Sequence, residues 1–124
     1  HYAKSADHVR SAMRRSGIHE LTNCGVNLRR RGGELRLGGV GDLWMDKQDL
    51  RAALGRSGRA DSAVLLSHNP DYAERIRDDR VGLVLSGHTH GGQCVFPLVG
   101  APILPSRYGQ KYASGLCRAP VAKV

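Results

Sequence analysis

The sequence predicts an α/β fold in which short strands and helices form packed layers. Two apolar runs, at 63–66 and 81–85, have the length and composition of buried strands. The segment between them opens with Pro70 and carries apolar residues at helical spacing to about Asp79, which predicts a helix. Together these three segments predict a βαβ unit. A chain of 124 residues is long enough to bury a core of its own.

The segments before this unit predict a helix, a hairpin and a second helix. Residues 5–16 place apolar side chains at helical spacing, and Gly17 ends the pattern. Two strands at 20–28 and 35–40 are expected to pair through a turn that contains glycine. A short helix is expected over 46–54, with Asp46 as its N-cap, and a polar loop follows it.

The tail after 94 is rich in proline and glycine and is expected to be loop with one or two short strands. No apolar run approaches the roughly 20 residues that span a bilayer. The first residues do not have the pattern of a signal peptide, and the absence of an initiator Met indicates a processed chain or a fragment.

The chain is basic, with 19 Lys and Arg against 11 Asp and Glu and a net charge of +8. Such a surface attracts phosphates, nucleic acid or anionic membranes. Apart from Arg14-Arg15 and Arg29–Arg31, the basic residues are scattered, and the aromatic content of 5% leaves few stacking platforms for single strands. Cys24, Cys94 and Cys117 form no CxxC pair, so we expect three free thiols in a reducing compartment.

Three histidines follow the two apolar strands. His68 lies in Ser67-His68-Asn69-Pro70, and His88 and His90 lie in a glycine-rich stretch over 86–92. Imidazole is the commonest side-chain metal ligand, and ligands of open α/β sheets bind at the carboxyl ends of strands. His88 and His90 would face one site if the chain stays extended through Thr89. The three histidines therefore predict a metal site, and with one water they would complete a mononuclear zinc centre.

A two-metal site needs more ligands than three histidines, usually including a bridging carboxylate. Asp42 is the best carboxylate candidate because it lies in a glycine-rich stretch, although a role in a turn is the commoner one for such a residue. Asp71 is expected in the first turn of a helix, where the helix dipole favours it. His8 and His19 lack a comparable setting and are expected on the surface.

The two histidine motifs together resemble those of the calcineurin-like metallophosphoesterases, and most closely the bacterial membrane-associated phosphodiesterase branch. The resemblance extends over nearly the whole chain. It also includes the segments Gly39–Trp44, Gly100–Gly109 and Tyr112–Leu116.

The resemblance implies a four-layer α/β/β/α sandwich, of which residues 1–124 would form the C-terminal half of a single domain. It implies hydrolysis of a phosphodiester or phosphomonoester by a hydroxide that two divalent ions (Mn, Fe or Zn) activate. In that arrangement His68 and His88 would bind the second metal and His90 the first. Arg107 and Tyr108 are candidates for substrate binding, because a guanidinium can bind a phosphate through two hydrogen bonds.

The family's earlier motifs are absent from this sequence. They are an Asp-x-His, a Gly-Asp and a Gly-Asn-His followed by Asp or Glu, and they supply the bridging Asp, an Asn ligand and the histidine that assists the leaving group. His1 could be that histidine, but Tyr2 follows it in place of an acidic residue. No other catalytic residue is identified. The chain as given is therefore expected to be inactive.

Two other functions stay open at the level of the sequence. The chain could be a complete three-histidine zinc hydrolase, or a basic nucleic-acid-binding module whose affinity falls steeply with salt. The favoured partners are a phosphate-ester substrate and an anionic membrane surface, with no specific nucleic acid. The expected location is the cytoplasm or the inner face of the membrane. The identity of the substrate cannot be read from the sequence.

Overall fold

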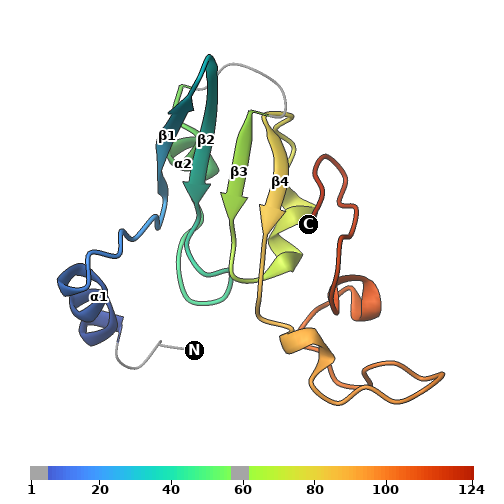
Figure 1. Ribbon diagram of the computed structural model, residues 1–124. Coiled ribbons are helices and arrows are strands. Elements are labelled where there is room, and N and C mark those ends of the chain that lie inside the picture. Colours follow the sequence, from blue (N-terminus) through green and yellow to red (C-terminus); the bar gives the residue numbers. More distant parts are fainter. Residues whose placement is uncertain (1–5, 57–61) are drawn as a thin grey trace.

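The structure is a computed structural model, and it describes residues 6–56 and 62–124 (Figure 1). It is an α/β fold built on one sheet, with two short helices on one side and a long irregular tail. The elements in chain order are α1 (Ala6–Arg15), β1 (Cys24–Arg30), β2 (Gly33–Gly39), α2 (Leu50–Leu54), β3 (Ala63–Leu66), the 3-10 helix η1 (Pro70–Arg75), β4 (Val81–Leu85), and the 3-10 helices η2 (His90–Gly92) and η3 (Gly109–Tyr112).

The sheet has four strands in the order β1-β2-β3-β4. β1 and β2 are antiparallel and form the predicted hairpin, whereas β2, β3 and β4 are parallel. The connection from β3 through η1 to β4 is the predicted βαβ unit. Because three neighbouring strands run the same way, their carboxyl ends meet at one edge of the sheet, the lower edge in Figure 1.

One face of the sheet is covered. Ala63, Leu65 and Val84 are buried on this face, in one core with residues of α2 and η1. Both helices lie behind the sheet in Figure 1. The approach of α2 requires glycine at position 38, because a Cβ there would lie 2.9 Å from the carbonyl oxygen of Ala53.

The opposite face of the sheet is apolar and open. The strand register places Val26, Leu37, Val64 and Leu83 in one row across all four strands, since side chains two apart share a face. The neighbouring rows add further leucines, and four of the large apolar side chains on this face are 37–51% exposed: Val26, Leu28, Leu35 and Leu85. No helix in the described part of the chain covers them (Figure 1). An exposed apolar surface of this kind indicates a surface that another element covers.

The boundaries of two predicted helices are wrong. The helix expected from Asp46 begins at Leu50, and its N-cap is Asp49, whose carboxylate accepts the N–H of Ala52 at 2.9 Å. The carboxylate of Asp46 instead accepts the N–H of Asp42 at 3.2 Å, within the preceding loop. The helix expected to run from Pro70 to about Asp79 is a 3-10 helix that ends at Arg75.

The predictions for α1 and the hairpin agree with the fold, but the one or two short strands expected in the tail are not formed in the described residues. α1 lies within the helix predicted over 5–16, and Ser5 falls outside the described residues. Apart from η3, the tail forms isolated bridges, which join Phe96 to Gly100, Arg118 to Lys123 and Leu83 to Lys123. None of the described helices has the length and apolar character needed to cross a membrane.

Candidate functional site

A hollow of about 370 Å³ lies at the carboxyl ends of β2, β3 and β4. Its walls come from the last residues of these three strands, the residues that follow them, and the segment before β1, as expected for parallel strands that end at one edge. The lining is half apolar and half polar. It consists of Leu21, Thr22, Gly39, Val40, Leu66, Ser67, His68, Leu85, Ser86 and Gly87.

His68 and His88 are brought together beside this hollow. Nε2 of His68 lies 3.2 Å from Nδ1 of His88, and the two ring centroids are 5.0 Å apart. The segments that carry them are joined by the backbone, because the N–H of Gly87 donates to the carbonyl oxygen of His68 at 3.1 Å. His68 is exposed and His88 is buried, with the Trp44 ring 4.5 Å away between centroids in an edge-on arrangement.

The distance between these two nitrogens fits one shared metal ion. Two imidazole nitrogens at about 2.0–2.1 Å from a tetrahedral zinc ion lie about 3.3 Å from each other. The same distance also allows one neutral ring to donate a hydrogen bond to the other. The distance between the two nitrogens is therefore compatible with two ligands of one ion.

The neighbourhood keeps His68 in the form that binds metals. Partial burial of the ring, and then the nearby His88, lower the pKa of His68, while the Asp42 carboxylate acts in the opposite direction. A lowered pKa favours the neutral imidazole at neutral pH. Only the neutral ring has a lone pair to offer a metal.

His90 does not join this pair in the way that the sequence predicted. The chain is not extended through Thr89, which has φ −74° and ψ −13°. His88 and His90 both adopt left-handed backbone conformations, with φ of 68° and 53°. Among residues 6–56 and 62–124, no group of three or more His, Cys, Asp or Glu side chains could hold one metal ion. The described residues thus bring together two of the three predicted ligands.

The tight turn at 87–92 explains this difference. The N–H of Thr89 bonds back to the carbonyl oxygen of Gly87 at 2.8 Å, and the N–H of Gly92 bonds to that of Thr89 at 2.9 Å. The hydroxyl of Thr89 donates to the carbonyl oxygen of Ala113 at 3.1 Å, which ties the turn to η3. A left-handed conformation at a histidine is uncommon and is typical of sites where the surrounding structure imposes it.

Asp42 acts as a turn residue. Its carboxylate accepts the backbone N–H groups of Trp44 and Met45 at 2.9 and 3.0 Å. It therefore fixes the loop that carries Trp44 against His88. Asp42 is near enough to affect the pKa of His68. The Oδ1 atom of Asp42, however, already accepts the two backbone hydrogen bonds. The sequence favoured this turn role for Asp42, and the structure agrees with it.

Asp71 is the polar residue near the site that the sequence reasoning undervalued. It lies in the first turn of η1, as predicted, but it is 5% exposed, and its carboxylate accepts the Ser106 hydroxyl and the Arg107 N–H. Asn69, between His68 and Asp71, is also buried and accepts the N–H of Asp71 at 2.9 Å. The run of Asn69, Pro70 and Asp71 directly after His68 was the feature of the sequence that could have indicated these buried polar side chains.

Comparison with known proteins gives three informative relatives. YkuE of Bacillus subtilis, an uncharacterized metallophosphoesterase, is 38% identical over 85 residues, which are 68% of this chain and 29% of YkuE. Phosphodiesterase YaeI of Escherichia coli is 35% identical over 112 residues, or 87% of this chain and 38% of YaeI. UDP-2,3-diacylglucosamine pyrophosphatase LpxG of Chlamydia trachomatis is 29% identical over 90 residues, or 73% of this chain and 26% of LpxG.

The chain is a relative of the metallophosphoesterases. This relationship agrees with the calcineurin-like resemblance of the two histidine motifs. The chain spans between about a quarter and two fifths of the length of these three relatives. No family model matches the chain, and no solved structure matches it.

The other residues predicted for this metallophosphoesterase relative do not line the hollow, or they lie outside the described residues. Arg107 and Tyr108 are exposed on the loop before η3, and neither lines the hollow at the strand ends. Their role in substrate binding stays a prediction. His1 lies outside the described residues. His8 and His19 are exposed, and the three cysteines are free thiols, as expected.

Proposed function

We propose that this chain carries part of the active site of a metal-dependent phosphoesterase that hydrolyses phosphodiesters or phosphomonoesters with two divalent ions. The observation that carries the proposal is the pair of histidine nitrogens, 3.2 Å apart, at the ends of two adjacent parallel strands. The names of YaeI and LpxG, a phosphodiesterase and a pyrophosphatase, support chemistry at a phosphate group.

In this proposal His68 and His88 bind one ion, and His90 binds the other. When bound, the two ions polarise the phosphoryl group, activate a water molecule and stabilise the leaving oxygen. The described residues supply the support for that chemistry. The Gly87–His68 backbone hydrogen bond fixes the two strand ends, and the Trp44 ring holds one edge of the His88 ring. Such support limits the freedom of the ligands, which strengthens metal binding.

The open face of the sheet supports the proposed sandwich. A second sheet that packs on the rows containing Leu37, Val64 and Leu83 would bury this apolar surface, as facing sheets do at a spacing of about 10 Å. Its strand ends would then lie beside the hollow and could contribute the carboxylate and Asn ligands. We propose on this basis that residues 1–124 form the C-terminal half of one domain and that these residues alone are inactive.

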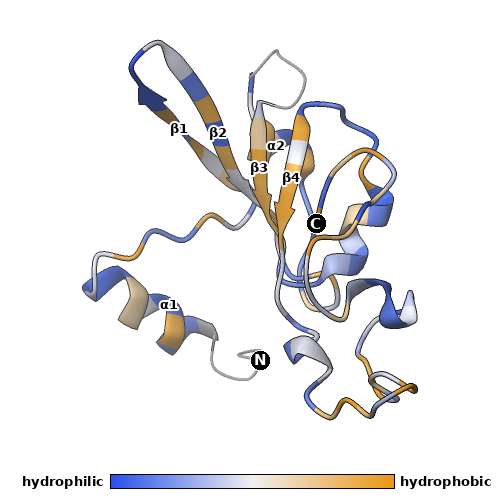
Figure 2. Ribbon diagram, turned by 45° about the vertical axis from the view of Figure 1, so that its right-hand side comes forward, coloured by the Kyte–Doolittle hydropathy of each residue, from blue (hydrophilic) through white to orange (hydrophobic). Residues whose placement is uncertain are grey.

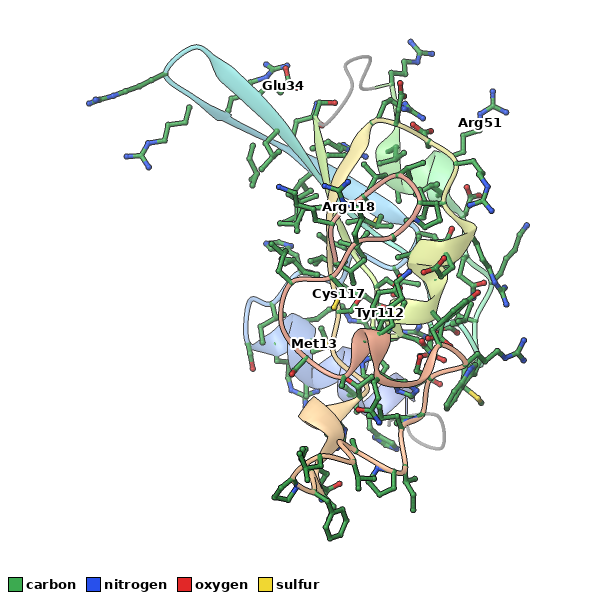
Figure 3. The ribbon with its side chains drawn as sticks, turned by 90° about the vertical axis from the view of Figure 1, so that its right-hand side faces the viewer. Met13, Glu34, Arg51, Tyr112, Cys117 and Arg118 are labelled. Carbon is green, nitrogen blue, oxygen red and sulfur yellow. The ribbon has the colours of Figure 1, made fainter. Side chains whose placement is uncertain are left out.

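The nucleic-acid-binding alternative gains no support from the position of the arginine cluster. Arg29, Arg30 and Arg31 lie at the tip of the β1–β2 hairpin, near the labelled Glu34 in Figure 3. β2 runs from this tip to the hollow, so the cluster and the histidines lie at opposite ends of the sheet. Arg29 also forms an ion pair with Glu34 at 3.5 Å.

The test is hydrolysis of an activated aryl phosphodiester with Mn²⁺, by the protein as its native source produces it. We expect His68→Ala and His88→Ala each to lower the turnover at least about a hundredfold, because loss of a residue that merely supports a ligand already costs about 10–100-fold. His19→Ala, at an exposed position, is the matched control and should hydrolyse at the wild-type rate. Retained hydrolysis in a folded His68→Ala variant would refute the proposal.

A further inference from the structure

A buried carboxylate joins the segment after His68 to the tail of the chain. Asp71 lies in the first turn of η1, is 5% exposed, and accepts hydrogen bonds from residues 35 and 36 positions further along. Its Oδ1 atom accepts the Ser106 hydroxyl at 2.5 Å, and its Oδ2 atom accepts the N–H of Arg107 at 2.8 Å. Both oxygens of one carboxylate therefore hold the same short piece of the loop before η3.

These hydrogen bonds fix three successive residues, which we call the 106–108 loop. The Oγ atom of Ser106 donates to Asp71 and also accepts the N–H of Tyr108 at 3.1 Å, two residues further on, as serine does in tight turns. None of the described helices or strands includes these residues. The carboxylate of Asp71 and the hydroxyl of Ser106, and not regular secondary structure, therefore set the backbone on both sides of Arg107.

Asp71 is itself fixed relative to His68. The Oδ1 atom of Asn69 accepts the N–H of Asp71 at 2.9 Å, and the Ser67 hydroxyl donates to the carbonyl oxygen of Asn69 at 3.0 Å. Ser67 and Asn69 are buried, and only Pro70, whose ring fixes φ, separates Asn69 from Asp71. A continuous set of hydrogen bonds thus leads from the neighbours of the candidate metal ligand to the 106–108 loop.

The two 3-10 helices on either side of this connection are neighbours. η1 and η3 lie side by side in the views of Figures 1 and 2, and Figure 2 draws both mainly in the blue of hydrophilic residues. A second carboxylate of η1, that of Glu74, binds Lys111 and Tyr112 of η3. η1 therefore has two polar contacts with the tail, and of these two the contact made by Asp71 reaches Arg107.

The contact fixes the backbone of Arg107 and leaves its charge available. A buried carboxylate is unfavourable unless its oxygens are hydrogen-bonded, and Asp71 forms no ion pair with the described residues. Hydrogen bonds to an ionised group are short and strong, so they define one geometry. The Arg107 guanidinium forms no hydrogen bond or ion pair with the described residues. Asp71 therefore holds Arg107 in place without neutralising it.

We propose that Asp71 is a positioning residue of the phosphoesterase reaction and that it acts through Arg107. The Arg107 guanidinium binds non-bridging oxygens of the substrate phosphate, and the hydrogen bonds of Asp71 keep that guanidinium at a fixed place relative to His68. A guanidinium matches two phosphate oxygens, and a small misplacement of such a group slows a reaction strongly. The inference rests on the proposed function, because it takes the substrate to carry a phosphate group.

The experiment is a double-mutant cycle on the hydrolysis of an activated aryl phosphodiester with Mn²⁺, by the protein as its native source produces it. Asp71→Asn and Arg107→Ala should each lower kcat/KM about ten- to a hundredfold. In the Arg107→Ala background, Asp71→Asn should lower it by less than about a further twofold. Glu74→Gln is the matched control, since it changes the other carboxylate of η1 that binds the tail, and it should alter kcat/KM by less than about twofold.

A merely structural role of Asp71 gives a different result. Asp71→Asn would then lower kcat/KM by the same factor in both backgrounds, and that outcome would overturn the proposal. Circular dichroism shows whether each variant is folded. The affinity for Mn²⁺, measured by the fluorescence of Trp44, should be the same in Asp71→Asn and the wild type. A weaker affinity would also overturn the proposal, because Asp71 would then act on His68.

Ser106 provides a milder pair of variants that decides the question if Asp71→Asn does not fold. Ser106→Ala removes the hydroxyl that joins Asp71 to Tyr108, so kcat/KM should fall, and the fall should again disappear in the Arg107→Ala background. Ser106→Thr keeps a hydroxyl and should restore the value of the wild type. Wild-type kinetics in Ser106→Ala would overturn the proposal.

Equilibrium dialysis against radiolabelled inorganic phosphate, with Mn²⁺ present, repeats the cycle without turnover. The wild type should bind phosphate at least about tenfold more tightly than either single variant, and the double variant should bind as Arg107→Ala does. If the wild type does not hydrolyse the ester, the proposed function fails, and the dialysis still decides whether Asp71 and Arg107 act together on a phosphate. Equal hydrolysis by the wild type and Arg107→Ala would leave the proposed function standing and overturn this inference.

Discussion

The Asp71 carboxylate and the Ser106 hydroxyl, 35 residues apart in the chain, form a hydrogen bond of 2.5 Å. The second carboxylate oxygen of Asp71 accepts the N–H of Arg107 at 2.8 Å. The segment that follows His68 is thereby tied to the loop before η3. This connection fixes part of the tail against the segment that carries His68.

Asp71→Asn should destabilise the protein by about 1–3 kcal/mol. The amide can replace only one of the two carboxylate oxygens, so a donor NH₂ group would face either the Ser106 hydroxyl or the Arg107 N–H. Because Asp71 is 5% exposed, water has little access to the new amide and compensates only in part for the mismatched contact. The measurement is the free energy of unfolding in urea.

Asp79→Asn is the control for this substitution. Asp79 is exposed at the turn before β4, so the same chemical change there should alter the free energy of unfolding by less than about 0.5 kcal/mol. Equal effects of the two substitutions would show that the hydrogen bonds of Asp71 with Ser106 and Arg107 add nothing to the free energy of unfolding.

Much of the fold could be predicted because local patterns specify it. α1, the β1–β2 hairpin and the βαβ unit each follow from the periodicity of apolar residues over a few positions, with glycine or proline at their ends. The start of α2 could not be fixed in this way. Asp46 and Asp49 are both good N-caps, and the choice depends on Asn23, whose side-chain oxygen accepts the N–H of Asp49 at 2.8 Å from a distant part of the chain.

The candidate site was predictable in its components and not in its geometry. The sequence indicated that His68 and His88 end neighbouring strands, and the parallel register brings them together. The left-handed conformations of His88 and His90 are imposed by hydrogen bonds of the 87–92 turn and by Thr89 contacting Ala113. No local sequence pattern indicates such distant contacts. The prediction that the chain is extended from His88 through His90 was wrong for this reason.

Gly38→Ala should destabilise the protein by about 1–3 kcal/mol. The new methyl group would lie 2.9 Å from the Ala53 carbonyl oxygen and 3.3 Å from its Cβ, so α2 would have to move away from the sheet. Gly33→Ala is the matched control in the same strand, since its nearest contact would be at 3.6 Å. Urea unfolding of both variants checks this; similar losses would show that the α2 contact tolerates a methyl group.

Because of Glu74, the free energy of unfolding should decrease as the pH falls. Burial raises the pKa of its carboxyl, but hydrogen bonds from the Lys111 ammonium and the Tyr112 hydroxyl, each 2.5 Å long, outweigh burial, and the pKa lies below its usual value. A lowered pKa in the folded state means that the contribution is present above the ordinary glutamate pKa. It is lost as pH falls through the folded value.

Glu74→Gln should therefore lose less stability than the wild type between about pH 7 and about pH 3, a range that spans the ordinary glutamate pKa. Glu34→Gln, at an exposed hairpin carboxylate, is the control and should follow the wild type. Urea unfolding at each pH gives the comparison. Parallel pH profiles for the wild type and Glu74→Gln would contradict the expectation.

Trp44 should report metal binding by the histidine pair. It is the only tryptophan of the chain, and its ring lies 4.5 Å from that of His88 between centroids. Mn²⁺ bound by His68 and His88 would therefore lie near the indole, and its unpaired electrons should quench the emission. A titration of the fluorescence with Mn²⁺ measures the affinity. His88→Ala and His68→Ala should each weaken the apparent affinity at least about tenfold.

His90→Ala distinguishes the two metal arrangements. Because the described residues gather His68 and His88 but no third ligand, His90→Ala should change the titration of these 124 residues less than either of the other variants. A three-histidine zinc centre would instead require equal losses for all three variants. Quenching that persists unchanged in His88→Ala would mean that Mn²⁺ binds elsewhere, and the shared-ion interpretation of the 3.2 Å contact would then be wrong.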